Sequence, residues 1–116
     1  MAAAGLVTLA NGNLEQCISA ASLALQNSLG MICDPIGVRV EAPCLGRNVM
    51  AASNALSCAN MAIANYDPVI TFDEVVKTMW DVGNSMAHEL RCTGLGGLAI
   101  TDSAKAVERR LQKISC

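Results

Sequence analysis

Apolar residues recur at three- and four-residue steps in several parts of the chain, and this spacing places them on one face of an α-helix. In the first such segment the repeating positions are Leu14, Ile18, Ala21, Leu25 and Leu29. Asn13 stands before them as a candidate N-cap, and Gly30 follows as a candidate stop. The pattern therefore predicts a helix over residues 14–29.

Three further helices are predicted downstream. The first, over about residues 45–64, is rich in Ala, Asn and Met, and the turn at 65–68 ends it. Thr71 to Glu74 has the pattern of a capping box, so the second begins there and ends near Ala87 or His88. Its expected inward residues are Val75, Val76, Met79, Val82 and Met86.

The last helix is predicted to begin at Thr101 or Asp102. One side of it is apolar and consists of Ala104, Val107, Leu111 and Ile114. The other side is basic and consists of Lys105, Arg109, Arg110 and Lys113. A basic side of this kind is typical of a solvated face, and the alternative is contact with a partner chain.

Composition supports the same class of fold. Hydrophobic residues make up 53% of the 116 residues but aromatic residues only 3%, so small and aliphatic side chains must build the core. That favours closely spaced helices over a β-sandwich. Because no repeat or linker is evident, we expect residues 1–116 to form part of one compact all-α domain.

Charge and cysteine content limit the classes of partner. A formal net charge of -2 gives no broad basic field, so nucleic acid is not an expected partner. Residues 16–33 and 48–66 carry no formal charge and are about long enough to cross a bilayer, but their Asn, Ser and Gln content favours buried helices of a soluble protein. Six cysteines without an export signal favour a reducing, cytoplasmic location, with free thiols or metal ligands.

Two of these cysteines bracket an unusual loop. Cys33-Asp34-Pro35 opens it and Pro43-Cys44 closes it, with residues 38–40 expected to be briefly extended. Soft thiolates held in irregular backbone suit an iron–sulfur cluster. The C-x10-C spacing alone fits no common metal motif, however, and two cysteines cannot hold a cluster. From spacing alone, buried or incidental thiols are the favoured alternative.

The sequence around this loop resembles that of a known family. The runs Leu29-Gly30-Met31-Ile32-Cys33-Asp34-Pro35 and Ala42-Pro43-Cys44-Leu45-Gly46-Arg47-Asn48 resemble the signature of iron–sulfur-dependent L-serine dehydratases. The segment Leu90-Arg91-Cys92-Thr93-Gly94-Leu95-Gly96-Gly97-Leu98-Ala99 is similar to the family's T-x-x-GGLA segment. Residues 1–6 resemble the stretch that follows the family's first cluster cysteine, so the resemblance covers nearly the whole chain.

The resemblance implies an all-α domain with a cluster-binding loop, a glycine-rich loop and the activity of an L-serine ammonia-lyase. That activity converts L-serine to pyruvate and ammonia, within amino-acid degradation and gluconeogenesis. The family's [4Fe–4S] cluster is held by three cysteines and leaves one iron open as a Lewis acid. Cys33 and Cys44 would be two of the three ligands. The third lies upstream of the position of Met1, so the missing upstream segment or a beta subunit is the expected partner and the chain alone is expected to be inactive.

Five residues near these motifs are candidates for binding substrate: Arg47, Asn48, Thr93, Gly96 and Gly97. An Arg can bind a carboxylate through two hydrogen bonds, although helix capping and a surface ion pair are equally consistent with Arg47. The glycines would let backbone approach a ligand closely. No catalytic base is identified, because the sole histidine, His88, is expected to be a charge partner at a helix end.

The loop itself departs from the family at Val38, where the family has glycine. A β-branched residue would be strained there if the position has φ > 0, and this puts the cluster geometry in question. Cys92 is expected to be a passive thiol, and Cys17 and Cys58 to be core residues. Cys116 resembles the terminal cysteine of some single-chain relatives, but a whole helix separates it from the glycine-rich loop.

Two other functions remain open at this point. One is a degenerate, non-catalytic helical interaction domain without metal. The other is a related lyase that acts on another hydroxy- or thiol-amino acid.

Overall fold

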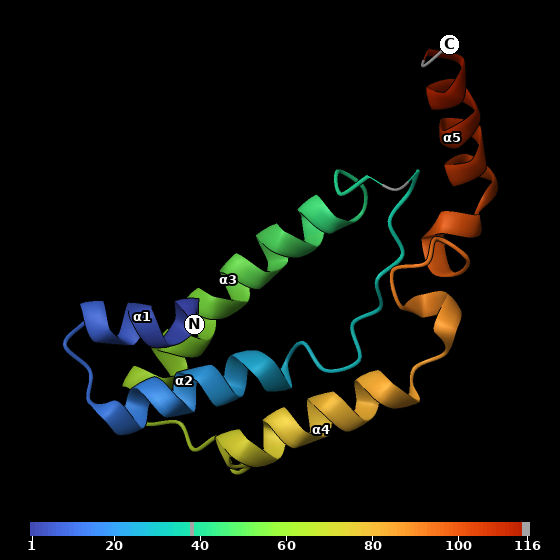
Figure 1. The fold of residues 1–116 in the computed structure, drawn as a ribbon. Coiled ribbons are helices and arrows are strands. Elements are labelled where there is room, and N and C mark those ends of the chain that lie inside the picture. The colour runs from blue at the N-terminus through green and yellow to red at the C-terminus, as the bar shows by residue number, and fades with distance from the viewer. Residues whose placement is uncertain (38, 115–116) are drawn as a thin grey trace. The chain divides into compact units, whose positions relative to one another are not determined.

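The computed structural model describes residues 1–37 and 39–114 and contains five α-helices (Figure 1). They are α1 (Ala2–Leu9), α2 (Leu14–Gln26), α3 (Cys44–Ile63), α4 (Phe72–Ser85) and α5 (Asp102–Ile114), with two 3₁₀ turns, η1 (His88–Leu90) and η2 (Gly97–Ile100). Within these ranges β-structure is limited to isolated bridges, Cys33 with Arg91 and Ile36 with Arg39. The all-α prediction is confirmed.

The helix boundaries follow the local signals. Asn13 caps α2 as predicted, because its side chain accepts from the Gln16 N–H at 2.9 Å while the Gln16 side chain accepts from the Asn13 N–H at 3.0 Å. The helix ends at Gln26, three residues before the predicted end, and Gly30 adopts φ 74° after it. The bounds of α3 lie within one residue of the prediction at each end.

The structure differs from the helix predictions at three further points. The eight-residue α1 was not predicted, because Met1 supplies no side-chain cap and the segment has no marked apolar periodicity. The helix that begins after Thr71 ends at Ser85 and not at Ala87 or His88. On this helix Val75 is buried, but Val76 is exposed and does not face the core.

The chain divides into two compact units. The first consists of residues 1–30 and 49–84, and the second of residues 31–48 together with the described part of 85–116. The expectation that residues 1–116 belong to one domain is not tested by this division and stays a prediction.

The core of the first unit is built from small side chains on α1, α2 and α3. It consists of Ala3, Val7, Ala20, Leu23, Ala55, Cys58, Ala59 and Ala62. Small residues let helix backbones approach closely, and α1 and α2 lie side by side in Figure 1. Cys58 is fully buried and Cys17 packs against the cluster, so both are the core residues that were predicted. Burial raises the pKa of the Cys58 thiol.

Polar side chains on the uncharged helices bond across this unit. The Asn27 amide donates to Asn54 Oδ1 at 2.7 Å, and the Asn54 amide donates to the Ala24 carbonyl at 3.1 Å. The Gln26 amide donates to the Pro68 carbonyl at 3.1 Å. Amides therefore join α2 to α3 and to the turn after it.

No helix in the described ranges has both the length and the apolar composition that crossing a bilayer requires.

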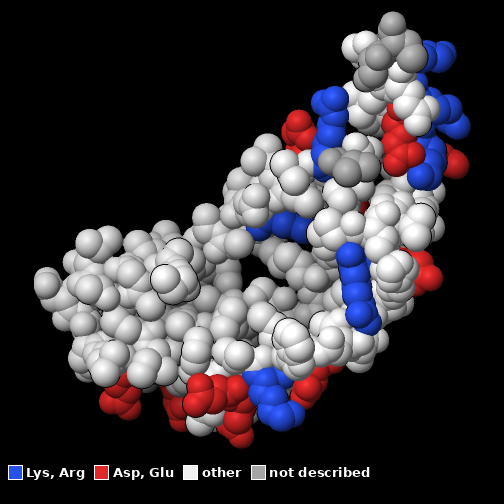
Figure 2. Space-filling model, viewed as in Figure 1, with Lys and Arg blue, Asp and Glu red and all other residues white. Residues whose placement is uncertain are grey.

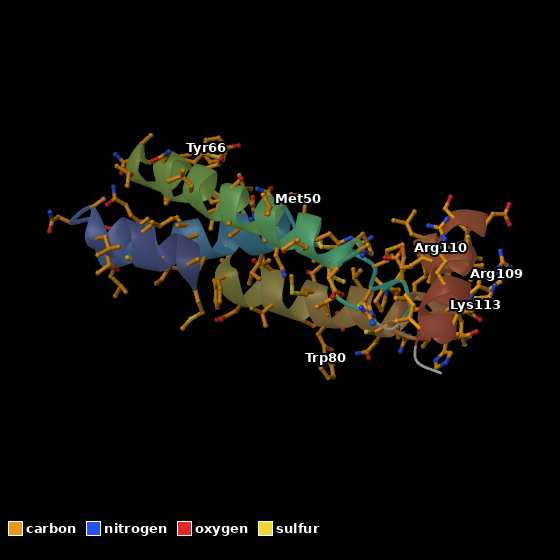
Figure 3. All side chains as sticks on the ribbon, turned by 90° about the horizontal axis from the view of Figure 1, so that it is seen from above. Met50, Tyr66, Trp80, Arg109, Arg110 and Lys113 are labelled. Atoms are coloured by element: carbon orange, nitrogen blue, oxygen red, sulfur yellow. The ribbon has the colours of Figure 1, made fainter. Side chains whose placement is uncertain are left out.

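Exposed side chains distinguish the outer faces of the helices. Trp80 projects away from α4 in Figure 3 and is 72% exposed.

On α5 the basic residues Arg109, Arg110 and Lys113 are exposed, as predicted, and point outward from the helix (Figure 3). Several of the Lys and Arg side chains visible in Figure 2 lie over α5. On the opposite side of α5, Ala104 is buried but Ile114 is exposed, which the predicted apolar face did not anticipate.

The cap of α2 gives a first testable prediction. We expect Asn13→Ala to lower the free energy of unfolding by about 1 kcal/mol, because the Gln16 N–H loses its acceptor. Asn13→Ser keeps an oxygen at this position and should recover most of the loss. Chemical denaturation followed by circular dichroism measures both variants. Equal stability of the two variants would contradict a role for the cap.

Candidate functional site

Asp34 is a buried residue of the second unit whose carboxylate bonds to other segments of that unit. Its carboxylate is 0% exposed. Oδ1 accepts a hydrogen bond from Arg47 Nη1 at 2.5 Å, and Oδ2 accepts one from the Leu98 N–H at 2.6 Å. Arg47 Nη1 also donates to the Ile32 carbonyl at 3.0 Å. One buried carboxylate thus joins the start of the cysteine loop, the first turn of α3 and the glycine-rich loop.

The charge state of Asp34 follows from these partners. Burial by itself raises the pKa of the carboxyl, but the Leu98 N–H and the Arg47 guanidinium oppose it. Their combined effect is larger, so the pKa of Asp34 is lowered from its ordinary value. The residue is therefore an ionised carboxylate at neutral pH, with Arg47 as its counter-charge.

Two glycines of the glycine-rich loop lie very close to neighbouring residues of the second unit. Gly97 adopts φ 60°, and a Cβ atom there would lie 2.4 Å from Asp34 Oδ2. A Cβ atom on Gly96 would lie 2.9 Å from the Glu89 Cβ and 3.0 Å from the Glu89 carbonyl oxygen. Only a hydrogen side chain fits at either position, and Gly97 also requires left-handed backbone.

A backbone hydrogen bond joins Cys92 to Cys33, beside the bridge between Cys33 and Arg91. The Cys33 N–H donates to the Leu90 carbonyl at 2.9 Å, and the Cys92 N–H donates to the Cys33 carbonyl at 2.7 Å. Cys92 adopts φ 63°, a left-handed conformation that is uncommon for a residue other than glycine. The exposed Cys92 thus lies directly beside the half-buried Cys33.

The groups around Cys33 change the pKa of its thiol. A side-chain hydrogen bond with Cys92, followed by burial, raises the pKa of the Cys33 thiol. The nearby charges of Cys92 and Cys44 raise it further, while Arg47 lowers it. Both other described cysteines of the second unit thus raise the pKa of the Cys33 thiol, and the Arg47 guanidinium opposes them.

Cys44 owes its position to the end of the loop. It is the first residue of α3 and is half-buried. The Ile36 N–H donates to the Ala42 carbonyl at 3.0 Å, and this bond brings the two ends of the loop together. The loop contains an isolated bridge between Ile36 and Arg39, and the expected extended segment over residues 38–40 stays a prediction. Val38 lies outside the described residues, and so does Cys116.

The donor atoms fit part of a cluster site. Cys33 and Cys44 are free, half-buried thiols at the two ends of an irregular loop, which is the ligand type and setting that iron–sulfur clusters use. Within residues 1–37 and 39–114, however, no three His, Cys, Asp or Glu side chains are grouped so that they could hold a metal ion. The two thiols can therefore contribute to a site but do not complete one there.

Three of the candidate substrate-binding residues differ in their hydrogen bonds and exposure: Arg47, Thr93 and Asn48. Arg47 is engaged by Asp34 and the Ile32 carbonyl, so its predicted ion pair is present but is largely buried and not at the surface. The Thr93 hydroxyl donates to the Glu89 carbonyl at 3.0 Å and accepts from the Leu95 N–H at 3.3 Å. Asn48 is exposed on α3. Substrate binding by these residues stays a prediction.

Asp34 is the residue whose role the sequence did not reveal. The sequence indicates only a turn at Asp34 before Pro35, and the residue's partners lie 13 and 64 residues away. A usable signal was present, since Asp34, Arg47 and Gly97 each belong to one of the motifs that carry the family resemblance. His88, the sole histidine, is exposed in η1.

Comparison with known proteins gives one family. The family model for the serine dehydratase alpha chain matches residues 1–99. The probable L-serine dehydratase alpha chain of Bacillus subtilis is 44% identical over 111 residues, which are 96% of this chain and 37% of that protein. The L-serine dehydratase alpha chain of Peptoniphilus asaccharolyticus is 45% identical over 113 residues, 97% of this chain and 39% of that protein. L-serine dehydratase 1 of Escherichia coli is 41% identical over 101 residues, 86% of this chain and 22% of that protein. The chain spans less than half the length of each of these relatives.

Proposed function

Because the chain belongs to the serine dehydratase alpha chain family, we propose that it forms part of an L-serine dehydratase that converts L-serine to pyruvate and ammonia. The observation that carries this proposal is the junction at Asp34. It joins the three segments that bear the family motifs and holds Cys33 and Cys44 at the ends of one loop. The complete activity would belong to a longer protein or to an assembly that contains this chain.

Within this proposal Cys33 and Cys44 are two of the three ligands of a [4Fe–4S] cluster. When bound, the cluster would supply a Lewis-acidic iron for the substrate hydroxyl. The third cysteine would come from the upstream segment or from another subunit. Asp34 and Arg47 act as positioning residues, since Asp34 directly follows Cys33 and Arg47 lies one turn beyond Cys44. The positive charge of Arg47 also favours the thiolate form that binds metal.

Substrate recognition would involve the glycine-rich loop and the start of α3. Asn48 offers an exposed amide one residue beyond Arg47, and Thr93 lies next to Cys92. We assign Gly96 and Gly97 a packing role first, because their hydrogen side chains allow the close approach to Glu89 and Asp34. Any contact of Arg47 with the substrate carboxylate would have to be made while it remains paired with Asp34.

A chimera tests the proposal. Residues 1–116 would replace the matching segment of the Peptoniphilus asaccharolyticus alpha chain, and the anaerobically reconstituted protein would be assayed for iron, sulfide and serine-dependent pyruvate. We expect Cys33→Ser and Cys44→Ser each to lower bound iron by at least about tenfold and to abolish pyruvate formation. Cys17→Ser, in the core of the first unit, is the matched control and should retain both.

Other outcomes separate the alternatives. Full iron content in the Cys33→Ser chimera would overturn the ligand assignment. A folded chimera with neither iron nor pyruvate formation would favour the metal-free interaction domain. Serine, threonine and cysteine assayed side by side would identify a related lyase with another substrate.

A further inference from the structure

We propose that Cys33 and Cys92 form an intramolecular disulfide when no cluster is bound, which makes this pair a redox modification site of the second unit. Formation of the disulfide depends only on the proximity of Cys33 and Cys92 in the folded chain. Its consequence, that oxidation withdraws Cys33 from the cluster, rests on the proposed function.

The backbone holds the two cysteines at the separation that a disulfide needs. The N–H of Cys92 donates to the carbonyl of Cys33 at 2.7 Å, and the N–H of Cys33 donates to the Leu90 carbonyl at 2.9 Å. The bridge itself pairs Cys33 with Arg91, so Cys92 is the residue next to the one opposite Cys33. Disulfides span Cα separations of about 4.4–6.8 Å. Because the Cys92 N–H bonds directly to the Cys33 carbonyl, standard bond lengths keep their Cα atoms within about 6.6 Å of each other, so the pair is within reach of a disulfide.

The backbone of Cys92 is unusual at this contact. The left-handed backbone of Cys92 (φ 63°) is a conformation that a non-glycine residue rarely adopts without a reason. Strain of this kind occurs at functional positions, and here it lies at the residue whose N–H bonds to the Cys33 carbonyl.

The remaining described cysteines are occupied elsewhere. The Cys17 sulfur lies 3.4 Å from the Thr8 hydroxyl, and the Cys58 sulfur lies 3.3 Å from Asn54 Oδ1, both within the first unit. Among the described residues of the second unit, Cys44 is the remaining competitor for Cys33. The proposal therefore predicts one specific pairing, Cys33 with Cys92, over Cys33 with Cys44.

Oxidised glutathione is a suitable oxidant, and the exchange balances in two steps. The exposed Cys92 gives up its proton and attacks one glutathione sulfur, so that a Cys92–glutathione disulfide forms and one glutathione thiolate leaves. Cys33 then gives up its proton and attacks the Cys92 sulfur, which releases the second glutathione. The two protons end on the two glutathione thiols, and the two electrons have passed from the cysteines to glutathione.

The test uses the whole 116-residue chain, prepared without iron under argon and then incubated with oxidised glutathione. Free thiols are blocked with iodoacetamide, and tryptic peptides are analysed by mass spectrometry. Trypsin places Cys33 in peptide 1–39, Cys44 in 40–47 and Cys92 in 92–105. We expect the 1–39 to 92–105 crosslink to exceed any other by at least about tenfold, because the fold holds this pair at high effective concentration. Fragment ions must place the link at Cys33 and not at Cys17, which shares its peptide.

Two variants control the result. Cys92→Ser should abolish the crosslink and leave Cys33 open to alkylation or to glutathione. Cys44→Ser removes the competing thiol and should leave the Cys33–Cys92 crosslink unchanged. A dominant link between Cys33 and Cys44, or no intramolecular link at all, would overturn the proposal.

A second measurement separates this inference from the proposed function. Oxidised and reduced samples of the chimera would be incubated with ferrous iron and sulfide. We expect the oxidised sample to bind less iron by at least about tenfold and dithiothreitol to restore it. If the crosslink forms but neither sample binds iron, the disulfide stands and the cluster assignment fails. If iron binds but the crosslink does not form, the disulfide proposal fails alone.

Discussion

Replacing Gly97 with alanine should lower the free energy of unfolding by about 3 kcal/mol or more. The new Cβ atom would lie 2.4 Å from Asp34 Oδ2 and 2.8 Å from the Asp34 Cβ. Since Gly97 has φ 60°, the substitution also costs about 1–2 kcal/mol in backbone strain. To make room, the Asp34 carboxylate must move away from the Leu98 N–H and from Arg47, the two groups that most lower its pKa.

Gly94→Ala is the matched control for this substitution. Gly94 also has positive φ (69°), but a Cβ atom there would meet nothing within 4 Å. It should therefore cost only the backbone term of about 1 kcal/mol. Urea denaturation gives the two stabilities, and hydrogen exchange at the Leu98 amide reports on the junction itself. We expect faster exchange at Leu98 in Gly97→Ala alone. Equal costs for the two variants would show that the close approach to Asp34 is not what requires glycine.

The helices could be predicted from sequence because their signals are local. The capping boxes at Asn13 and Thr71 each act over three residues, and the structure has both sets of hydrogen bonds. The prediction failed where no local signal exists. Met1 provides no side-chain cap for α1, and the exposure of Val76 depends on which other elements cover α4, a property that periodicity does not contain.

The junction at Asp34 could not be derived from spacing for the same reason. The hydrogen bond to Leu98 connects positions 64 residues apart in the chain. It forms because Gly97 leaves room for the carboxylate, and a glycine in a sequence does not reveal which group approaches it. The approach of Cys92 to Cys33 is similar, since it depends on a left-handed residue that is not glycine. The resemblance to a family named the motifs, whereas the structure adds the contacts that connect them.

Replacing Asp34 with asparagine should also cost about 3 kcal/mol at neutral pH, through loss of charge and not of shape. Asparagine has nearly the same size and keeps one acceptor, but it leaves the Arg47 guanidinium, whose side chain is 24% exposed, without its counter-charge. Breaking one partner of a buried ion pair is costly because the other charge stays desolvated. Asp81→Asn is the matched control. It breaks the solvent-exposed pair between Asp81 and Lys77 and should leave stability nearly unchanged.

The pH dependence of the same variant identifies charge as the cause. The pKa of Asp34 is lower in the folded chain than its ordinary value of about 3.9, so the folded state binds a proton less readily than the unfolded state. The stabilisation is therefore complete above about pH 4 and is lost as the pH falls through the lowered pKa of the folded state. Below that pH the wild-type Asp34 is also neutral. The stability difference between the wild type and Asp34→Asn should thus shrink in acid, as measured by urea denaturation at a series of pH values. A difference that stays constant down to about pH 3 would show that packing, and not the ion pair with Arg47, accounts for the loss.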